Sequence, residues 1–171
     1  RSAYARPPLR PPETSMRLGI LAVGHKLPDW VAKGCAEYVK RMPRELPLSV
    51  VEVKPEPRGS KTREQLLAAE KSRLQAALSG FSRVVVLDER GTDLTTVKLA
   101  QRLEDWMREG GDTAFIIGGA DGIDEELKQR ADAMIRLSSL TLPHAMARLV
   151  LCEQLYRAVS VVKNHPYHRE G

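Results

Sequence analysis

The chain has 171 residues, a formal net charge of +5, 42% hydrophobic residues and 29% charged residues. This length and composition are those of a globular protein with one core, and no apolar run approaches the roughly 20 residues of a membrane span. The positive charge favours a polyanionic partner, but charge alone does not distinguish a nucleic-acid-binding protein from other basic proteins.

Residues 1–15 are rich in proline and arginine. They contain no apolar stretch of the kind that a secretory signal requires. We therefore expect a disordered extension over 1–15, a single domain over 16–171 and a cytoplasmic location.

From Met16 onward, short β-rich runs alternate with longer helical ones. The first predicted strand covers residues 18–23, and a helix over 29–42 follows, with a proline and an acidic residue at its start. A second strand is predicted over 48–53. Residues 54–61 combine prolines, a glycine and charged side chains, which is typical of a loop. A helix capped by Thr62 and reaching about residue 79 completes this half.

The second half of the chain continues the alternation. The predicted strands cover 83–88, 113–117 and 133–137. The predicted helices cover 95–109, 124–130 and 143–162. Strands that alternate with helices predict an α/β fold with a parallel sheet covered by helices on both faces.

The helix predicted over 143–162 is apolar on two sides. One apolar stripe is formed by Met146, Leu149 and Val150, and the other by Leu151, Leu155, Ala158, Val159 and Val162. The side chains left to meet water are Arg148, Glu153, Gln154 and Arg157. One stripe can pack on the sheet, and the other needs a neighbouring helix or a second subunit in a two-fold dimer. We favour the dimer.

Three segments follow predicted strands of the second half, at the edge of a parallel sheet where ligands usually bind. They are 88–91, 118–122 and 138–142. Gly118, Gly119 and Gly122 allow the backbone to approach a ligand closely, although a plain tight turn would look the same. Neither a dinucleotide-binding fingerprint nor a phosphate-binding P-loop is present.

The segment 137–144 ends in Pro143, which suits the first turn of a helix. Its backbone is therefore expected to be held rigidly. Leu140 and Leu142 could line an apolar slot in which main-chain groups contact a purine, or they could simply fill the core.

The C-terminal segment 164–170 combines an aromatic ring, two imidazoles and a guanidinium. Such groups stack on bases and bind phosphates, although a polar chain end is the plainer interpretation. Further candidate phosphate contacts are Arg41, Arg44, Arg58, Lys61 and Arg63. No metal site is expected, because His165 and His168 lack further ligands, and we interpret Cys35 and Cys152 as reduced packing residues.

Short motifs along the chain occur in the order of a known family. They are AVGHKLPDW (22–30), EY (37–38), LD (87–88), IGG (117–119), LTLPH (140–144), EQLYRA (153–158) and NHPYH (164–168). In these motifs the chain resembles the SPOUT methyltransferases, and within them the RlmH family of large-subunit ribosomal RNA pseudouridine methyltransferases. It departs from the family pattern at Ala120 and Asp121, where Pro-Glu is expected.

The resemblance implies a parallel-sheet SPOUT fold with a C-terminal trefoil knot, which general topology rules do not anticipate. It also implies a homodimer that uses S-adenosyl-L-methionine to methylate N3 of a pseudouridine in large-subunit ribosomal RNA, within assembled ribosomes. The implied cofactor contacts are Leu87, Gly118, Leu137, Ser138, Ser139, Leu140, Thr141 and Leu142. The implied substrate-side and catalytic residues are Tyr167, His168 and Arg169.

Two other classes of function remain open. A non-catalytic RNA-binding or ribosome-assembly protein could keep the same fold without turning over a cofactor. A different nucleotide-binding α/β enzyme is disfavoured by the missing phosphate motifs. Neither alternative explains the order of the matched motifs.

Overall fold

The structure is a computed structural model that describes residues 15–169. The disordered extension expected over 1–15 therefore lies, apart from Ser15, outside the described residues. The strands are β1 (Leu18–Val23), β2 (Leu48–Val53), β3 (Arg83–Asp93), β4 (Thr113–Ile117) and β5 (Ala133–Arg136). The helices are α1 (Asp29–Arg41), α2 (Arg63–Ala77), α3 (Thr96–Glu109), α4 (Glu125–Arg130), α5 (His144–Val162) and the 3₁₀ helix η1 (Pro166–Arg169).

The five strands form one sheet in the order β2-β1-β4-β3-β5, and every neighbouring pair is parallel. The central strands β1 and β4 are buried along their whole length. Apart from β3, the predicted elements are confirmed to within two residues at each end. The predicted α/β fold with a parallel sheet is confirmed.

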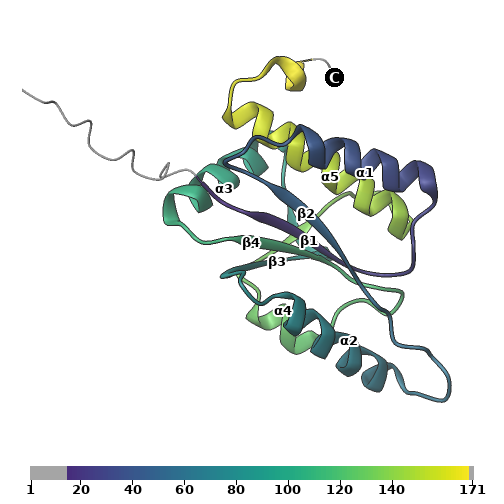
Figure 1. Ribbon diagram of the computed structural model, residues 1–171. Coiled ribbons are helices and arrows are strands. Elements are labelled where there is room, and N and C mark those ends of the chain that lie inside the picture. The colour runs from purple at the N-terminus through teal and green to yellow at the C-terminus, as the bar shows by residue number, and fades with distance from the viewer. Residues whose placement is uncertain (1–14, 170–171) are drawn as a thin grey trace, which may run out of the picture.

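Helices cover both faces of the sheet (Figure 1). The larger apolar core lies on one face, where α1, α3 and α5 pack, and includes Cys35 and Cys152 as buried free thiols. The smaller core lies on the other face, beneath α2 and α4, around Leu74 and Leu127. No helix within the described residues is long and apolar enough to cross a membrane.

The third strand differs from its predicted form. It was expected to end at Asp88 and lead into a loop, but β3 resumes pairing with β5 at Thr92. Leu87 and Thr92 both pair with Ile135, so residues 88–91 form an excursion that bulges out of the strand. Gly91 makes this possible, because a Cβ there would lie 2.5 Å from the backbone carbon of Ile135.

Helix α5 corrects a second prediction. Arg148 was expected to meet water, but it is fully buried. The stripe with Leu151, Leu155 and Val159 is buried in the larger core, and α1 and α3 both pack against α5. The stripe formed by Met146, Leu149 and Val150 stays partly exposed. Neighbouring helices thus cover one side of α5, and the dimer remains a prediction for the other.

Candidate functional site

A cavity of about 310 Å³ opens between the N-terminal end of α3 and the middle of α5, and we call it the α3–α5 cavity. The sheet contributes β3, β4 and β5, and the segment after β5 closes one side. The side chains that line it are mostly apolar, including Leu94, Leu99, Phe115, Ile135, Val150 and Leu151. Cavities of this size and lining are typical of small-molecule sites.

A few polar groups stand among the apolar walls. The Thr96 hydroxyl donates to the Gln154 carboxamide oxygen at 2.7 Å, so this pair bridges α3 and α5. Arg136 lines the cavity and is ion-paired with Asp93. The cavity therefore presents an amide, hydroxyls and one neutralised cation, which suits a ligand with both apolar and hydrogen-bonding parts.

Half of the predicted cofactor residues meet in this cavity. Leu87, Leu137, Ser138 and Leu142 all line it, although they come from the end of the first part of β3 and from the segment after β5. The remaining predicted residues do not line it. Ser139 and Thr141 are exposed, and Leu140 is 77% exposed. The Ser138 hydroxyl accepts a hydrogen bond from the Leu140 backbone N–H at 2.9 Å, which shapes this segment.

Gly118 lies in the turn after β4 and does not line the α3–α5 cavity. A Cβ on Gly118 would lie 2.7 Å from the Gly122 carbonyl oxygen, so only glycine fits this turn. The Gly118 carbonyl oxygen lies 3.2 Å from Nδ1 of His144, the first residue of α5. The turn after β4 is thus attached to the helix that carries part of the cavity wall.

His144 is held as the neutral imidazole. Its Nε2 accepts a hydrogen bond from Nε of Arg148 at 2.8 Å, which leaves the Nδ1 proton to donate to Gly118. Burial, and then the positive charge of Arg148, lower the pKa of His144 below its ordinary value of 6.5. Both effects disfavour the imidazolium, so the network has one stable protonation state.

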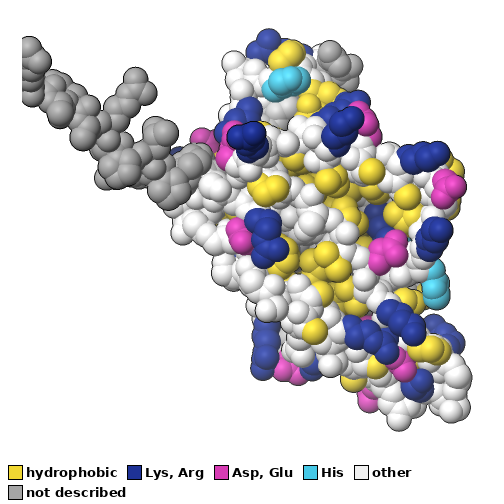
Figure 2. All heavy atoms as spheres, viewed as in Figure 1, with side chains coloured by type: hydrophobic (Ala, Val, Ile, Leu, Met, Phe, Trp, Pro, Cys, Tyr) yellow, Lys and Arg dark blue, Asp and Glu magenta, His cyan; other side chains and the backbone are white. Residues whose placement is uncertain are grey.

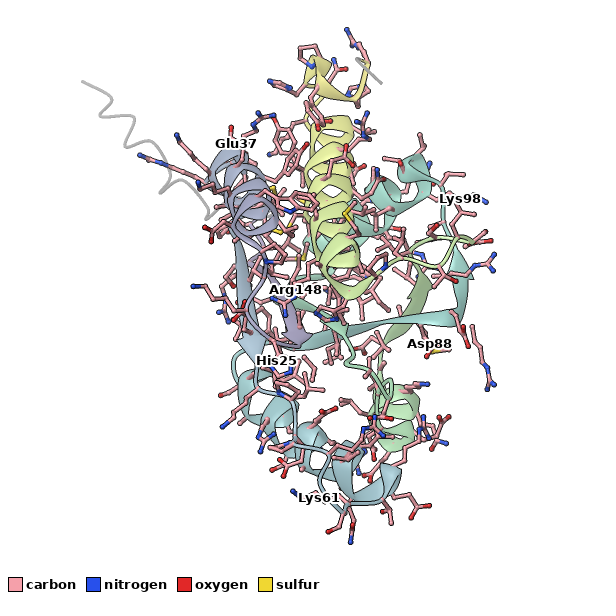
Figure 3. All side chains as sticks on the ribbon, turned by 90° about the vertical axis from the view of Figure 1, so that its right-hand side faces the viewer. His25, Glu37, Lys61, Asp88, Lys98 and Arg148 are labelled. Carbon is pink, nitrogen blue, oxygen red and sulfur yellow. The ribbon has the colours of Figure 1, made fainter. Side chains whose placement is uncertain are left out.

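Arg148 extends this network to β2, the edge strand of the sheet. Its Nη1 lies 3.0 Å from the Glu52 carboxylate of β2, and its Nη2 donates to the His25 carbonyl oxygen at 3.4 Å. Figure 3 shows Arg148 between α5 and the segment that carries His25. Helical periodicity missed this residue because its partners lie far away in the sequence. A cation among the apolar residues of the first half of α5 is the one signal that could have indicated them.

The predicted catalytic residues lie elsewhere. Tyr167 packs on Tyr156 with ring centroids 4.6 Å apart, and its hydroxyl lies 3.1 Å from the Tyr38 hydroxyl. His168 Nδ1 lies 3.4 Å from the Ser160 hydroxyl, and Arg169 donates to Asn164 at 3.0 Å. None of the three lines the α3–α5 cavity. The segment docks on the C-terminal part of α5 instead of fraying.

The Tyr167 hydroxyl also lies 3.3 Å from the Glu153 carboxylate, which Arg157 pairs with at 2.7 Å. Burial, the hydrogen bond with Tyr38 and the charge of Glu153 all raise the pKa of Tyr167. Tyr167 is therefore protonated at neutral pH, so in this position it serves as a hydrogen-bond donor and not as a base.

The predicted basic residues fall into two groups. Arg41 and Arg44 lie at and just after the C-terminal end of α1, where Arg41 pairs with Glu37 at 3.0 Å. Arg58, Lys61 and Arg63 lie between β2 and the start of α2. Figure 2 shows Lys and Arg side chains gathered at the lower right, where Figure 1 places this second segment. Within residues 15–169, no group of three or more His, Cys, Asp or Glu side chains could hold a metal ion.

Comparisons with known proteins give the family. Residues 16–168 match a family model described as "Predicted SPOUT methyltransferase". A protein named Ribosomal RNA large subunit methyltransferase H from Dechloromonas aromatica is 74% identical over 156 residues, which cover 91% of this chain and 100% of that protein. A protein of the same name from Burkholderia thailandensis is 59% identical over 155 residues, covering 90% of this chain and 99% of that protein.

A solved structure shares the fold. It is a probable methylase family protein from Haemophilus influenzae, with a TM-score of 0.53 and 16% identity, and the match covers 91% of this chain and 70% of that chain. The family match extends over the whole sheet, both helical layers and η1 up to His168. The chain therefore belongs to the SPOUT methyltransferase family, within its ribosomal RNA large subunit methyltransferase H group.

Proposed function

We propose that this protein transfers a methyl group from S-adenosyl-L-methionine to N3 of a pseudouridine in large-subunit ribosomal RNA. Membership of a methyltransferase family supports the reaction class. One observation carries the cofactor assignment, namely the convergence of Leu87, Leu137, Ser138 and Leu142 in the α3–α5 cavity. These residues are distant in the sequence, and the fold brings them to one small-molecule site.

The lining of the cavity fits the two halves of such a cofactor. Leu87, Leu137 and Leu142 offer an apolar slot for a purine ring, and the backbone of Ser138 and Leu142 offers N–H and carbonyl groups to its polar edge. Gln154 and Thr96 add hydrogen-bonding groups on the opposite wall. When bound, the cofactor would supply a methyl group that passes in line to the nucleophile, while the sulfur leaves as a neutral thioether.

The chain's own task is to position the nucleotide, exclude water and take up the N3 proton. His168 is the candidate acceptor for this proton, and the Arg169 guanidinium is the candidate group to stabilise the anion that develops. Tyr167, which is protonated, can orient the nucleotide through its hydroxyl. Tyr167, His168 and Arg169 lie on the C-terminal segment after α5, which we call the tail, and they do not line the cavity of their own chain. The tail must therefore act on a partner's cavity or leave its position on α5.

We infer a homodimer in the cytoplasm, acting on ribosomal RNA within assembled ribosomes. The partly exposed stripe of Met146, Leu149 and Val150 supports a second copy, and so does Trp30 of α1, which is 63% exposed. Figure 2 shows hydrophobic side chains gathered over the middle of one face, where Figure 1 places β2. The trefoil knot implied by the family resemblance remains a prediction.

Two measurements test the proposed function. Isothermal titration with S-adenosyl-L-methionine should show saturable binding of the cofactor. Leu142→Arg, which places a charge in the cavity, should abolish this binding. Mass spectrometry of ribosomal RNA nucleosides from cells lacking the protein should show the loss of one methylated pseudouridine. Cofactor binding with an unchanged nucleoside profile would exclude this substrate. No binding at all would favour a non-catalytic RNA-binding protein.

A further inference from the structure

A second cavity, of about 360 Å³, lies at the carboxyl ends of β1, β2 and β4, and we call it the β1–β4 cavity. Its walls come from His25 after β1, residues 54–58 after β2, residues of α2, and Ala120 and Asp121 after β4. The chain leaves β1 toward β2 at one edge of the sheet, but it leaves β4 toward β5 at the other edge. Ligands of parallel α/β sheets bind at such switch points.

The acidic groups of this cavity are already paired. The Glu70 side chain, only 7% exposed, accepts the Glu56 backbone N–H at 3.0 Å. The Glu56 carboxylate pairs with Lys61 at 2.9 Å and also with Arg73, and both contacts hold its pKa below the ordinary value. These bonds fix the segment 54–61 across α2. The carboxylates therefore shape the wall and do not await a cation.

The cationic groups have spare capacity. Arg58 contacts Asp121 through Nη2 alone, at 2.8 Å, which leaves Nε and Nη1 without an acceptor among residues 15–169. The Lys54 side chain is exposed, and it forms no salt bridge within residues 15–169. Pro55, Pro57 and Leu66 add apolar surface between these cations. The cavity thus offers N–H donors for an anion beside a wall for a flat ring.

We propose that the β1–β4 cavity binds one nucleotide of the substrate RNA, with its phosphate on Lys54 and Arg58 and its base or ribose against Pro55 and Pro57. The inference rests on the proposed function and assigns it a second binding site, separate from the α3–α5 cavity. The turn 118–121 joins the two sites. At one end of this turn, the Gly118 carbonyl oxygen is hydrogen-bonded to His144, which follows the proposed cofactor segment 137–142. At the other end, Ala120 and Asp121 line the β1–β4 cavity.

The test compares lysine variants in binding to a fluorescent stem-loop RNA. Lys54→Ala should weaken the affinity on the order of fivefold and lower the salt slope by about one. Lys54→Arg should restore both, because it keeps the charge. The matched control is Lys98→Ala on α3, also an exposed lysine, which lies far from His25 and Lys61 in Figure 3 and should leave RNA binding unchanged. Equal losses in Lys54→Ala and Lys98→Ala would overturn the proposal.

Competition distinguishes the source of the anion. Uridine monophosphate should displace the RNA from the wild-type protein at a lower concentration than inorganic phosphate does, and Lys54→Ala should remove this difference. Equal competition by the two anions would show that the base and ribose are not recognised. Cofactor titration of Lys54→Ala keeps the two proposals apart. If Lys54→Ala kept full RNA affinity and normal cofactor binding, only the β1–β4 site would be excluded. If the wild-type protein bound RNA but no cofactor, only the methyltransferase assignment would be excluded.

Discussion

His144 connects the turn after β4 with helix α5 through two bonds that require opposite roles of one imidazole. Nδ1 must donate to Gly118, and Nε2 must accept from Arg148. Protonation would place a second N–H opposite the Arg148 guanidinium and create a buried like-charge contact. The orientation of the Gly118 turn therefore depends on a neutral His144.

This dependence predicts an effect of pH on stability. Because the folded-state pKa of His144 is lowered from 6.5, the unfolded chain binds this proton first as the pH falls. The stability conferred by neutral His144 is thus complete at high pH and declines below about pH 6.5. Urea unfolding at about pH 8 and about pH 5.5 should show a larger loss for the wild type than for His144→Asn, which keeps a donor toward Gly118 but does not titrate. Equal losses would mean that His144 does not contribute to the pH dependence.

The β3 excursion is the element whose shape most directly sets the α3–α5 cavity. It leaves the strand after Leu87, which lines the cavity, and rejoins β5 next to Ile135, which lines it too. A Cβ on Gly91 would lie within 2.5–2.8 Å of backbone atoms of Ile135 and Arg136 in β5. A side chain there would have to push β3 and β5 apart, because the opposing atoms belong to the backbone and cannot rotate away.

Gly91→Ala should therefore destabilise the fold by about 1–3 kcal/mol, as overpacking does elsewhere. It should also weaken cofactor binding, since both displaced strands carry cavity residues. Urea unfolding and cofactor titration measure the two effects. Glu89→Ala is the matched control, because Glu89 is exposed in the same excursion. If Gly91→Ala behaved like Glu89→Ala in both measurements, the excursion would not constrain the cavity.

The order and type of the elements could be predicted from the sequence because apolar periodicity reports local structure. Contacts between distant segments could not. Arg148 and Glu52 are 96 positions apart, so periodicity placed Arg148 in water although it is buried. The excursion of β3 depends on how closely Gly91 can approach Ile135, which no pattern within β3 reveals. The candidate segments were predicted from their places after strands, and the individual cofactor residues from the family resemblance. Which of them meet in one cavity required the fold, because Gly118 does not line it.

At the scale of the whole molecule, the tail and the α3–α5 cavity, proposed to bind the cofactor, lie in different parts of one chain. Tyr167 is docked between Tyr38 of α1 and Tyr156 of α5, whereas Gln154 and Val150 face the α3–α5 cavity from another side of the same helix. Figure 1 shows η1 beyond the C-terminal end of α5. In a two-fold dimer, each cavity has a second tail available to it, that of the partner copy.

Mixed dimers test this arrangement. Leu142→Arg disrupts the proposed cofactor site of its own chain, and His168→Ala removes the proposed proton acceptor of the tail, so each homodimer should be nearly inactive. If the tail acts on the partner, a heterodimer of the two variants contains one intact active site. This site combines the cavity of the His168→Ala chain with the tail of the Leu142→Arg chain. Methyl transfer should then recover to about half of the wild-type rate per dimer, because independent active sites contribute additively. A heterodimer as inactive as its parents would show that each tail serves its own chain, which would require Tyr167 to leave its dock on α5.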